Sequence, residues 1–320
     1  MIRWRHILPA LACAMAGLSA AHAAYPDHPV KVIVSLPPGS GADTTARFIS
    51  KYLAQELGQA FVVENRPGAN SFIAARAVAE AAPDGYTMFV ASNSPMVTNA
   101  AVFKHLPYDP VKDFAPVSSI ARFPMVLVVS ANSPYKTLGD LASAAKQAPG
   151  KLNYGSGTQT YQVAIERLHS RNGMKATPIQ YKGTAPAIND TAMGSVDYTM
   201  AEISSVLPLI RGGKLRALGV ASDVRLKELP DTPTISESGT PGFEASAWTG
   251  VFFPAHTPAA IVDKVSALVR ARMTSPEGSS FIENLGGVVF VTTPAQFRDF
   301  QVKEIQATRE IVKSANIPVE

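Results

Sequence analysis

The sequence almost lacks cysteine, and this absence excludes two kinds of chemistry at once. Its 320 residues include a single cysteine, Cys13, close to the N-terminus. If the first 23 residues are removed, the remaining chain has no thiol, so neither a disulfide framework nor a cysteine nucleophile is available to it. We therefore expect the fold to be held by its hydrophobic cores, and the 46% hydrophobic content is typical of a globular protein.

The sequence also lacks a hydrophobic run that suits a membrane-spanning helix. The apolar stretch near the N-terminus runs from about Ile7 to Ala20, short of the roughly 20 residues that such a helix needs. Arg3 and Arg5 precede it and an Ala-x-Ala site at residues 21–23 follows, a pattern typical of a secretion signal cleaved after residue 23. The prediction is a soluble, monomeric, periplasmic protein; a retained anchor and a lipoprotein acylated at Cys13 are the alternatives.

Charged residues and catalytic motifs are equally scarce. Charged residues make up 17% of the chain and the formal net charge is +4, too mild and too scattered to indicate a nucleic-acid partner. The histidines beyond residue 23 are far apart, which excludes a paired-histidine zinc motif. The chain has no G-x-S-x-G elbow, no phosphate-loop glycine-lysine pair and no complete dinucleotide fingerprint. We therefore predict no metal, no cofactor and no enzymatic activity.

What the sequence does contain is a recurring pattern of strand, small-residue loop and helix. The β-branched run Val30–Leu36 precedes a glycine-containing loop and a helical pattern that ends at Gly58. The same pattern recurs between Leu152 and Ser170. Such alternation predicts an α/β fold with parallel strands and with helices on the faces of the sheet. Two similar topologies without a sequence repeat indicate two lobes.

Two extended segments, Val117–Val129 and Glu244–Phe253, are expected to cross between these lobes. The last part of the chain then returns to the first lobe and ends in a long helix from Pro294 to about Ser314. We therefore assign residues 24–122 plus 248–320 to lobe 1 and residues 123–247 to lobe 2. The aromatic cluster at the second crossing, which comprises Trp248, Phe252 and Phe253, is expected to pack in the hinge or core.

Three loops of small polar residues, 37–44, 156–161 and 182–187, lie where a predicted strand ends and a helix begins. Ligands of open parallel sheets bind at such strand ends, and the free N–H groups of helix N-termini favour an anion. The first loop belongs to one lobe and the other two to the other lobe. A carboxylate between opposed helix N-termini is therefore the predicted ligand group, and simple strand–helix turns are the alternative.

Two carboxylates stand beside these loops. Asp43 ends the first loop, and Glu202 follows the predicted strand Val196–Met200. If either faces the cleft, it accepts a hydrogen bond from a ligand ammonium or hydroxyl group, which favours a zwitterionic or nitrogen-bearing acid. Otherwise Asp43 or Thr44 caps the following helix, and Glu202 is a solvated loop residue.

A series of motifs follows in order from Tyr25 to the C-terminus. It includes Pro37-Pro38-Gly39, Asn65-Arg66-Pro67-Gly68, Pro83-Asp84-Gly85-Tyr86, Lys151-Leu152-Asn153-Tyr154 and Gly212-Gly213-Lys214-Leu215. In these motifs the chain resembles the Bug family, the TctC-like extracytoplasmic receptors of tripartite tricarboxylate transporters. The resemblance implies a two-lobed "Venus flytrap" fold with two crossover segments, capture of a small organic acid between the lobes, and membrane permease subunits as partners.

The resemblance also implies a set of binding residues, because the family holds a carboxylate largely through loop N–H groups and ordered water. The predicted ligand-binding residues, with the two carboxylates and two weaker candidates at a strand end included, are Ser40, Gly41, Asp43, Thr44, Asn93, Ser94, Ser156, Gly157, Thr158, Gln159, Thr160, Lys182, Gly183, Thr184 and Glu202. The chain departs from the family pattern at Ser40, which separates two usually adjacent glycines, and at Gln162, where histidine is common.

Lys182 is the only cation among these candidates. A site with one cation and two carboxylates suits a trianion poorly, because unpaired buried charges cost several kcal/mol. We therefore predict a monocarboxylate or dicarboxylate, an amino acid or an aromatic acid as the ligand. The alternatives are a receptor that engages a sensor kinase and a hydrolase or isomerase built on the same cleft.

Overall fold

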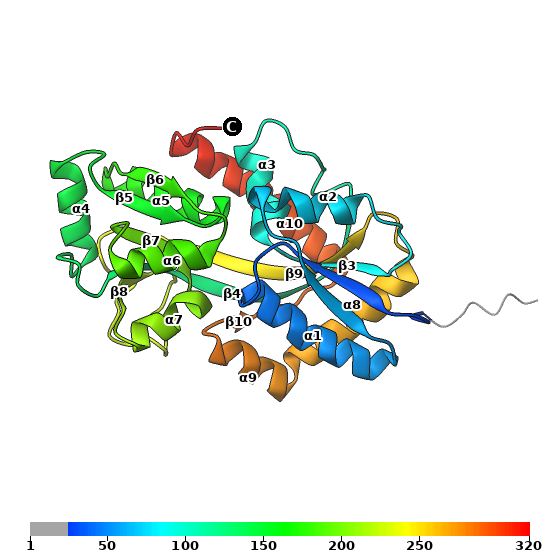
Figure 1. The fold of residues 1–320 in the computed structure, drawn as a ribbon. Coiled ribbons are helices and arrows are strands. Elements are labelled where there is room, and N and C mark those ends of the chain that lie inside the picture. Colours follow the sequence, from blue (N-terminus) through cyan, green and yellow to red (C-terminus); the bar gives the residue numbers. More distant parts are fainter. Residues whose placement is uncertain (1–24) are drawn as a thin grey trace, which may run out of the picture.

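The computed structural model describes residues 25–320, which form two α/β lobes side by side (Figure 1). The predicted signal peptide, residues 1–23, lies outside the described residues. Within them, no helix combines the length and the apolar character needed to cross a membrane. The strands form one sheet with the order β2-β1-β3-β9-β4-β7-β5-β6, and β8 and β10 also pair with β4.

Lobe 1 is built on the parallel strands β1 (Val30–Val34), β2 (Phe61–Asn65) and β3 (Thr87–Ser92), with β1 in the middle. All of β1 except Lys31 is buried, as a central strand covered on both faces requires. β9 (Ser246–Pro254) runs antiparallel beside β3, and the two-residue β10 (Val288–Val289) pairs with β4.

Lobe 2 repeats this arrangement with β5 (Asn153–Ser156) between β6 (Thr177–Gln180) and β7 (Tyr198–Glu202), all parallel. β7 and β8 (Leu215–Val220) both run antiparallel to the second half of β4. We expected a sheet of parallel strands only, and the sheet is instead mixed. The strands that are parallel are the ones joined through a helix, because a parallel pair needs a crossover connection.

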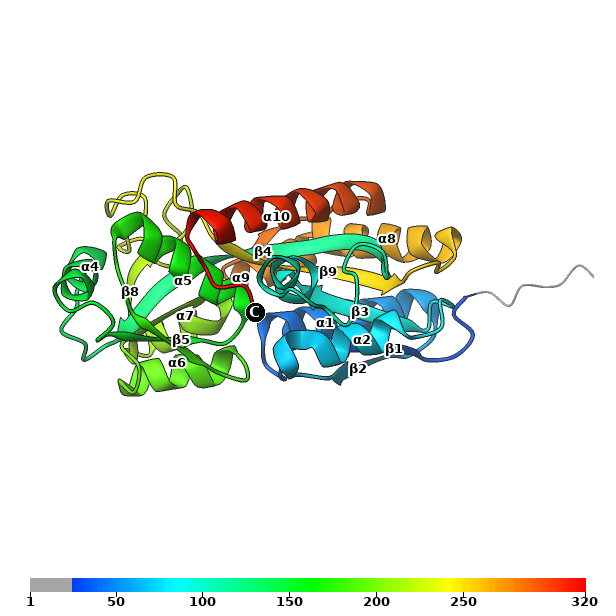
Figure 2. The ribbon, with the colours of Figure 1, turned by 90° about the horizontal axis from the view of Figure 1, so that it is seen from above.

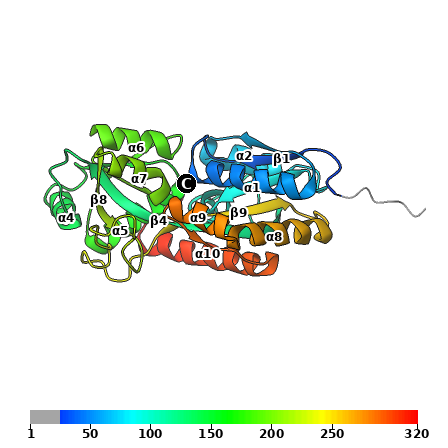
Figure 3. The ribbon, with the colours of Figure 1, turned by 90° about the horizontal axis from the view of Figure 1, so that it is seen from below.

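Helices cover the sheet of each lobe. In lobe 1 they are α1 (Gly41–Leu57), η1 (Ala69–Ser71), α2 (Phe72–Ala79), η2 (Ser94–Thr98), α3 (Asn99–Val102), α8 (Ala259–Thr274), α9 (Pro276–Asn284) and α10 (Pro294–Ser314). In lobe 2 they are α4 (Leu138–Gln147), α5 (Gln159–Asn172), α6 (Thr184–Met193) and α7 (Ile203–Arg211). α10 lies along β4, and its end reaches α5 of the other lobe (Figures 2 and 3).

Two long antiparallel strands, β4 (Phe114–Ser130) and β9, join the lobes. β4 pairs with β9 as far as Pro124 opposite Ser246, and from Met125 onward it pairs with β7 and β8 instead. The predicted fold class, a two-lobed binding-protein fold with two crossing segments, is thus confirmed. The predicted lobe boundaries at residues 123 and 247 stay a proposal, which the change of partner near Pro124 supports.

The start of α1 differs from the expectation that Asp43 or Thr44 caps it. Ser40 is the N-cap, since its backbone is extended and its Oγ accepts a hydrogen bond from the N–H of Asp43 at 3.3 Å. The helix then buries Ala46, Ile49 and Leu53 and ends at Gly58, as predicted; Gly58 adopts a left-handed conformation. The correction adds one turn to the helix and moves its N-terminus into the space between the lobes.

Candidate functional site

The loops of the two lobes meet around a small cavity. The cavity has a volume of about 20 Å³, enough for a single water molecule. Both lobes contribute to its lining, which comprises Leu36, Gly41, Ala42, Ser92, Asn93, Ser94, Phe123, Thr158, Thr160, Tyr161, Glu202, Ala247, Trp248 and Thr249. We call it the inner cavity. It lies beyond the carboxyl ends of β1, β3 and β7, where ligands of open α/β sheets bind.

Two larger cavities of about 220 and 230 Å³ adjoin it, and Leu36 lines all three. The first, here named the lysine cavity, lies between Lys182, Gly183 and Tyr181 of lobe 2 and the loop at residues 67–71 of lobe 1. The second lies between the loop at residues 36–40 and the helices α6 and α7. Lys182 is the one cationic residue that lines any of these three cavities, and Glu202 is the one acidic residue.

Direct contacts close the lobes over the inner cavity. The hydroxyl groups of Thr98 in lobe 1 and Thr160 in lobe 2 are 2.8 Å apart and hydrogen-bonded. A Cβ atom added to Gly41 would lie 3.4 Å from Glu202 Oε1, so the N-terminus of α1 abuts this carboxylate. A solute larger than water therefore does not fit in the inner cavity in this arrangement of the lobes.

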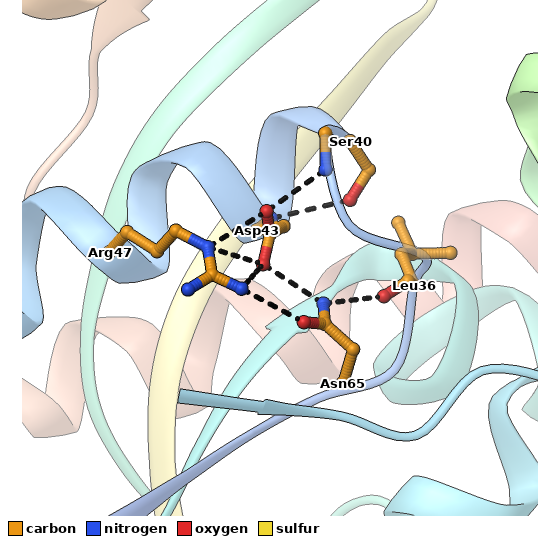
Figure 4. Close-up of polar contacts among 6 residues, drawn as sticks. Leu36, Ser40, Asp43, Arg47 and Asn65 are labelled. Atoms are coloured by element: carbon orange, nitrogen blue, oxygen red, sulfur yellow. Dashed lines mark hydrogen bonds and ion pairs between the residues drawn. The ribbon is translucent and has the colours of Figure 1, made fainter. Parts of the chain in front are cut away.

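The carboxylate of Asp43 braces the first loop (Figure 4). It accepts hydrogen bonds from the N–H of Gly39 at 2.9 Å, from Asn65 Nδ2 at 2.9 Å and from Arg47 Nε at 3.1 Å. Burial alone would raise the pKa of Asp43, but these donors, Arg47 foremost, outweigh it and hold that pKa below its ordinary value. Its oxygens are engaged in these bonds, so Asp43 shapes the loop, and it lines none of the three cavities; a direct contact with the ligand stays a prediction.

Close backbone packing positions the two loops of lobe 2. A Cβ atom added to Gly157 would lie 2.5 Å from the Cα of Thr184 and 2.6 Å from the carbonyl of Gly183, closer than real Cβ atoms approach. Ser156 Oγ donates to the carbonyl of Thr158 at 2.9 Å, which fixes the turn before α5. Only glycine at position 157 therefore lets the N-termini of α5 and α6 lie against each other.

Glu202 is buried at the inner cavity, with 5% of its surface exposed. It is the N-cap of α7, and Ser205 Oγ donates to its Oε1 at 2.9 Å. Burial raises the pKa of this carboxyl, and the bonds from Ser205 and from the amides of Glu202 and Gly41 offset only part of that effect. Among residues 25–320, no basic side chain forms an ion pair with it.

Three residues of lobe 1 that the sequence analysis missed line the same cavity with polar groups. Ser92 and Thr249 are direct partners on β3 and β9, and Trp248 precedes Thr249. Within the described residues, Ser92 Oγ, Thr249 Oγ1 and Trp248 Nε1 are buried and have no hydrogen-bond partner. Buried polar groups usually have a partner, so such groups beside a cavity indicate a polar ligand.

The predicted site residues fall into three groups. Those that line the inner cavity are Gly41, Asn93, Ser94, Thr158, Thr160 and Glu202. Those that line only the two adjoining cavities are Ser40, Gly157, Lys182, Gly183 and Thr184. Those that line none of them are Asp43, Thr44, Ser156 and Gln159. Across residues 25–320, no cluster of His, Cys, Asp and Glu suits a metal ion.

Comparison with known proteins gives a consistent result. The sequence pattern of the "Tripartite tricarboxylate transporter family receptor" matches residues 45–317. Protein BugT of Bordetella pertussis is 33% identical over 306 residues, which cover 94% of this chain and 94% of that protein.

Solved structures agree in fold. The R. palustris protein Rpa4515, solved with adipate, superposes with a TM-score of 0.89 at 33% identity, over 92% of this chain and 99% of that one. MatC from Rhodopseudomonas palustris, solved with bound malate, superposes with a TM-score of 0.85 at 32% identity, over 90% and 100% of the two chains.

Proposed function

Because the chain belongs to the receptor family of tripartite tricarboxylate transporters, we propose that it is an exported solute-binding protein that closes on a small carboxylate and presents it to a membrane permease. In this proposal the leader is cleaved after residue 23 and the mature chain acts as a monomer in the periplasm. The adipate and malate bound to two similar proteins support a carboxylate as the solute class.

One observation carries the proposal: the inner cavity is lined from both lobes and holds buried polar groups that have no partner in the described part of the chain. A solute that contacts both lobes stabilises the closed arrangement over the open one, which is the thermodynamic requirement for ligand-driven closure. The N-termini of α1 and α5 border this space, and a helix N-terminus favours a carboxylate oxygen. At α1 the amides of Gly41 and Asp43 already donate to Glu202 and to Ser40 Oγ.

The charges around the cavities favour solutes with few negative charges. Lys182 is exposed and is the one cation that lines them, whereas Glu202 is buried and acidic. A trianion such as citrate would place unpaired charge next to Glu202, at a cost of several kcal/mol. Monocarboxylates, dicarboxylates, amino acids and aromatic acids are therefore the favoured solutes.

A thermal-shift screen tests the solute class. We expect one or more of acetate, succinate, malate, adipate, aspartate, benzoate and nicotinate to stabilise the protein, by about 2.7 kcal/mol at 100 times its dissociation constant. Citrate is expected to give a smaller shift. A largest shift with citrate would overturn the charge argument, and no shift with any acid would overturn carboxylate binding.

Two further measurements test the rest of the proposal. Incubation with a bound acid should return it chemically unchanged, whereas a new product formed at enzymatic rates would make the protein an enzyme. Cell fractionation should find the mature chain in the periplasm, beginning at residue 24. Recovery from membranes with an acylated Cys13 would contradict the assigned cleavage.

A further inference from the structure

Within residues 25–320, Glu202 is a buried carboxylate without a cationic partner. Its one side-chain hydrogen bond comes from Ser205, which is neutral. The charged groups of the surrounding elements are directed elsewhere: Asp43 and Arg47 of α1 pair with each other, and neither acts on the pKa of Glu202. An ionised carboxylate in such a place is destabilised unless a positive charge approaches it.

By contrast, the wall of the inner cavity that lobe 1 supplies carries polar hydrogens that need an acceptor. The hydroxyls of Ser92 and Thr249 lie on paired positions of β3 and β9, are less than 10% exposed and have no partner in the described residues. The indole N–H of Trp248, in the same lining, is also unpaired and can only donate. These groups suit an acceptor such as a carboxylate.

We propose that the solute bears an ammonium group next to its carboxylate, as an α-amino acid does, and that Glu202 is the residue that selects it. This inference rests on the proposed function. The carboxylate of the solute accepts hydrogen bonds from the hydroxyls of Ser92 and Thr249, and the ammonium group donates to Glu202. The two lobes then hold opposite ends of one head group, so its binding favours closure.

The volumes of the cavities agree with this placement. The inner cavity holds no more than a water molecule in this arrangement, so in our proposal a head group enters it only when the lobes separate. The lysine cavity shares Leu36, Ser94 and Thr158 with it and has room for the rest of the solute, beside Lys182. Ammonium recognition therefore occurs in the inner cavity, and the side chain of the solute extends outward.

Two matched series of acids test the inference by calorimetry. Aspartate, malate and succinate share four carbons and differ in an ammonium, a hydroxyl or a hydrogen at the second carbon; alanine, lactate and propionate do the same with three carbons. In any series that binds, we expect the ammonium-bearing member to bind at least tenfold more tightly than the unsubstituted one. The reason is that only the ammonium group forms a buried charge-assisted hydrogen bond with Glu202.

The variant Glu202→Gln keeps the shape of the side chain and removes its charge. This variant should raise the dissociation constant of the ammonium-bearing acid at least tenfold and that of the unsubstituted acid less than twofold. Glu310→Gln, on the exposed face of α10, is the matched control and should change neither. The melting temperature of Glu202→Gln should not fall, because an uncompensated buried charge is lost; this measurement separates a binding defect from misfolding.

The outcomes distinguish this inference from the proposed function. Unsubstituted or hydroxyl-bearing acids that bind as tightly as the ammonium-bearing member would overturn the role of Glu202 and leave carboxylate capture intact. If the Glu202→Gln variant bound the amino acid as tightly as the wild type, the role of Glu202 would likewise be overturned, and carboxylate capture would stand. A failure of every acid in both series and in the wider screen would contradict carboxylate capture itself.

Discussion

At the scale of single residues, the two acidic side chains beside the binding loops, Asp43 and Glu202, have opposite environments. Asp43 is surrounded by donors, and its pKa is held below the ordinary value although burial opposes this. Glu202 is buried with one neutral side-chain donor, and its pKa is raised. Asp43 therefore stabilises the folded protein as a carboxylate, whereas Glu202 does so only when a ligand or a proton compensates its charge.

Replacement of Asp43 by Asn should lower the free energy of unfolding at pH 7 by about 1.5–3 kcal/mol, the value of charge-assisted hydrogen bonds. Because the folded pKa of Asp43 is lowered, its contribution is present above about pH 4, the unfolded value, and is lost as the pH falls through the folded pKa. Urea unfolding of the wild type and the variant from pH 7 to pH 3 measures this. The exposed Asp223→Asn is the control, and an equal difference at both pH extremes would contradict the ion-pair explanation.

Gly157 is the residue whose lack of a side chain holds the two lobe 2 loops together. Gly157→Ala should separate these loops, cost about 1–3 kcal/mol of stability through overpacking, and abolish the thermal shift caused by a bound acid. A methyl group added at Gly139, in the first turn of α4, would make only an ordinary van der Waals contact. Gly139→Ala should therefore leave the stability unchanged or raise it slightly. A Gly157→Ala protein that keeps its full ligand-induced shift would show that the loops tolerate the added methyl group.

At the scale of elements, the loop before α2 is strained. Ala69, Asn70 and Ser71 have consecutive positive φ angles of 44°, 51° and 70°, a region that side chains other than glycine rarely occupy. The amide of Asn99 holds this loop by donating to the carbonyl of Asn70 at 2.8 Å. The loop lines the lysine cavity, so its strain is located where the solute is proposed to extend.

Ala69→Gly should relieve part of this strain and raise the free energy of unfolding by about 1 kcal/mol. Ala77→Gly, within α2, should instead lower the free energy of unfolding by about 1 kcal/mol, because glycine is unfavourable inside a helix. Denaturant unfolding of the two variants compares them directly. Destabilisation of both would show that the loop at Ala69 is not strained in solution.

At the scale of the whole molecule, a small apolar cluster links the lobes one turn of α5 beyond the inner cavity. Val163 of α5 in lobe 2 packs with Ala101 and Val102 of lobe 1 and with Val312 and Ile317 near the C-terminus. The C-terminal Glu320 also pairs its backbone with Val102 and Lys104. The end of the chain thus contributes to the closed arrangement of the lobes.

Val163→Ala should therefore shift the lobes toward the open arrangement. The lost methyl groups are worth up to about 1.5 kcal/mol of closed-state stability, so the dissociation constant of a bound acid should rise by up to about tenfold. Calorimetry gives the affinity, and small-angle scattering of the ligand-free protein should show a larger radius of gyration. Val224→Ala, which is 64% exposed, should change neither quantity. Unchanged affinity and radius in Val163→Ala would mean that this cluster does not bias closure.

The sequence by itself determined where many of the helices and strands lie, because those signals are local. α10 begins and ends where predicted, at Pro294 and Ser314, since Thr293 caps it and proline suits its first turn. The helix α4 carries a local signal of the same kind, the capping box formed by Thr137 and Asp140, although we did not predict this helix. The alternation of these elements was enough to predict the α/β class and the two lobes.

Only the tertiary structure decided which side chains reach the cleft. Asp43 turned away because Asn65, 22 residues later, and Arg47 hold its carboxylate. Ser92 and Thr249 reach the inner cavity because β3 and β9 pair in one register, although 157 positions separate them in the chain. Strand register and lobe contact depend on distant residues, so no window of the sequence contains them; the local pattern fixes the elements, and packing between the elements fixes the site.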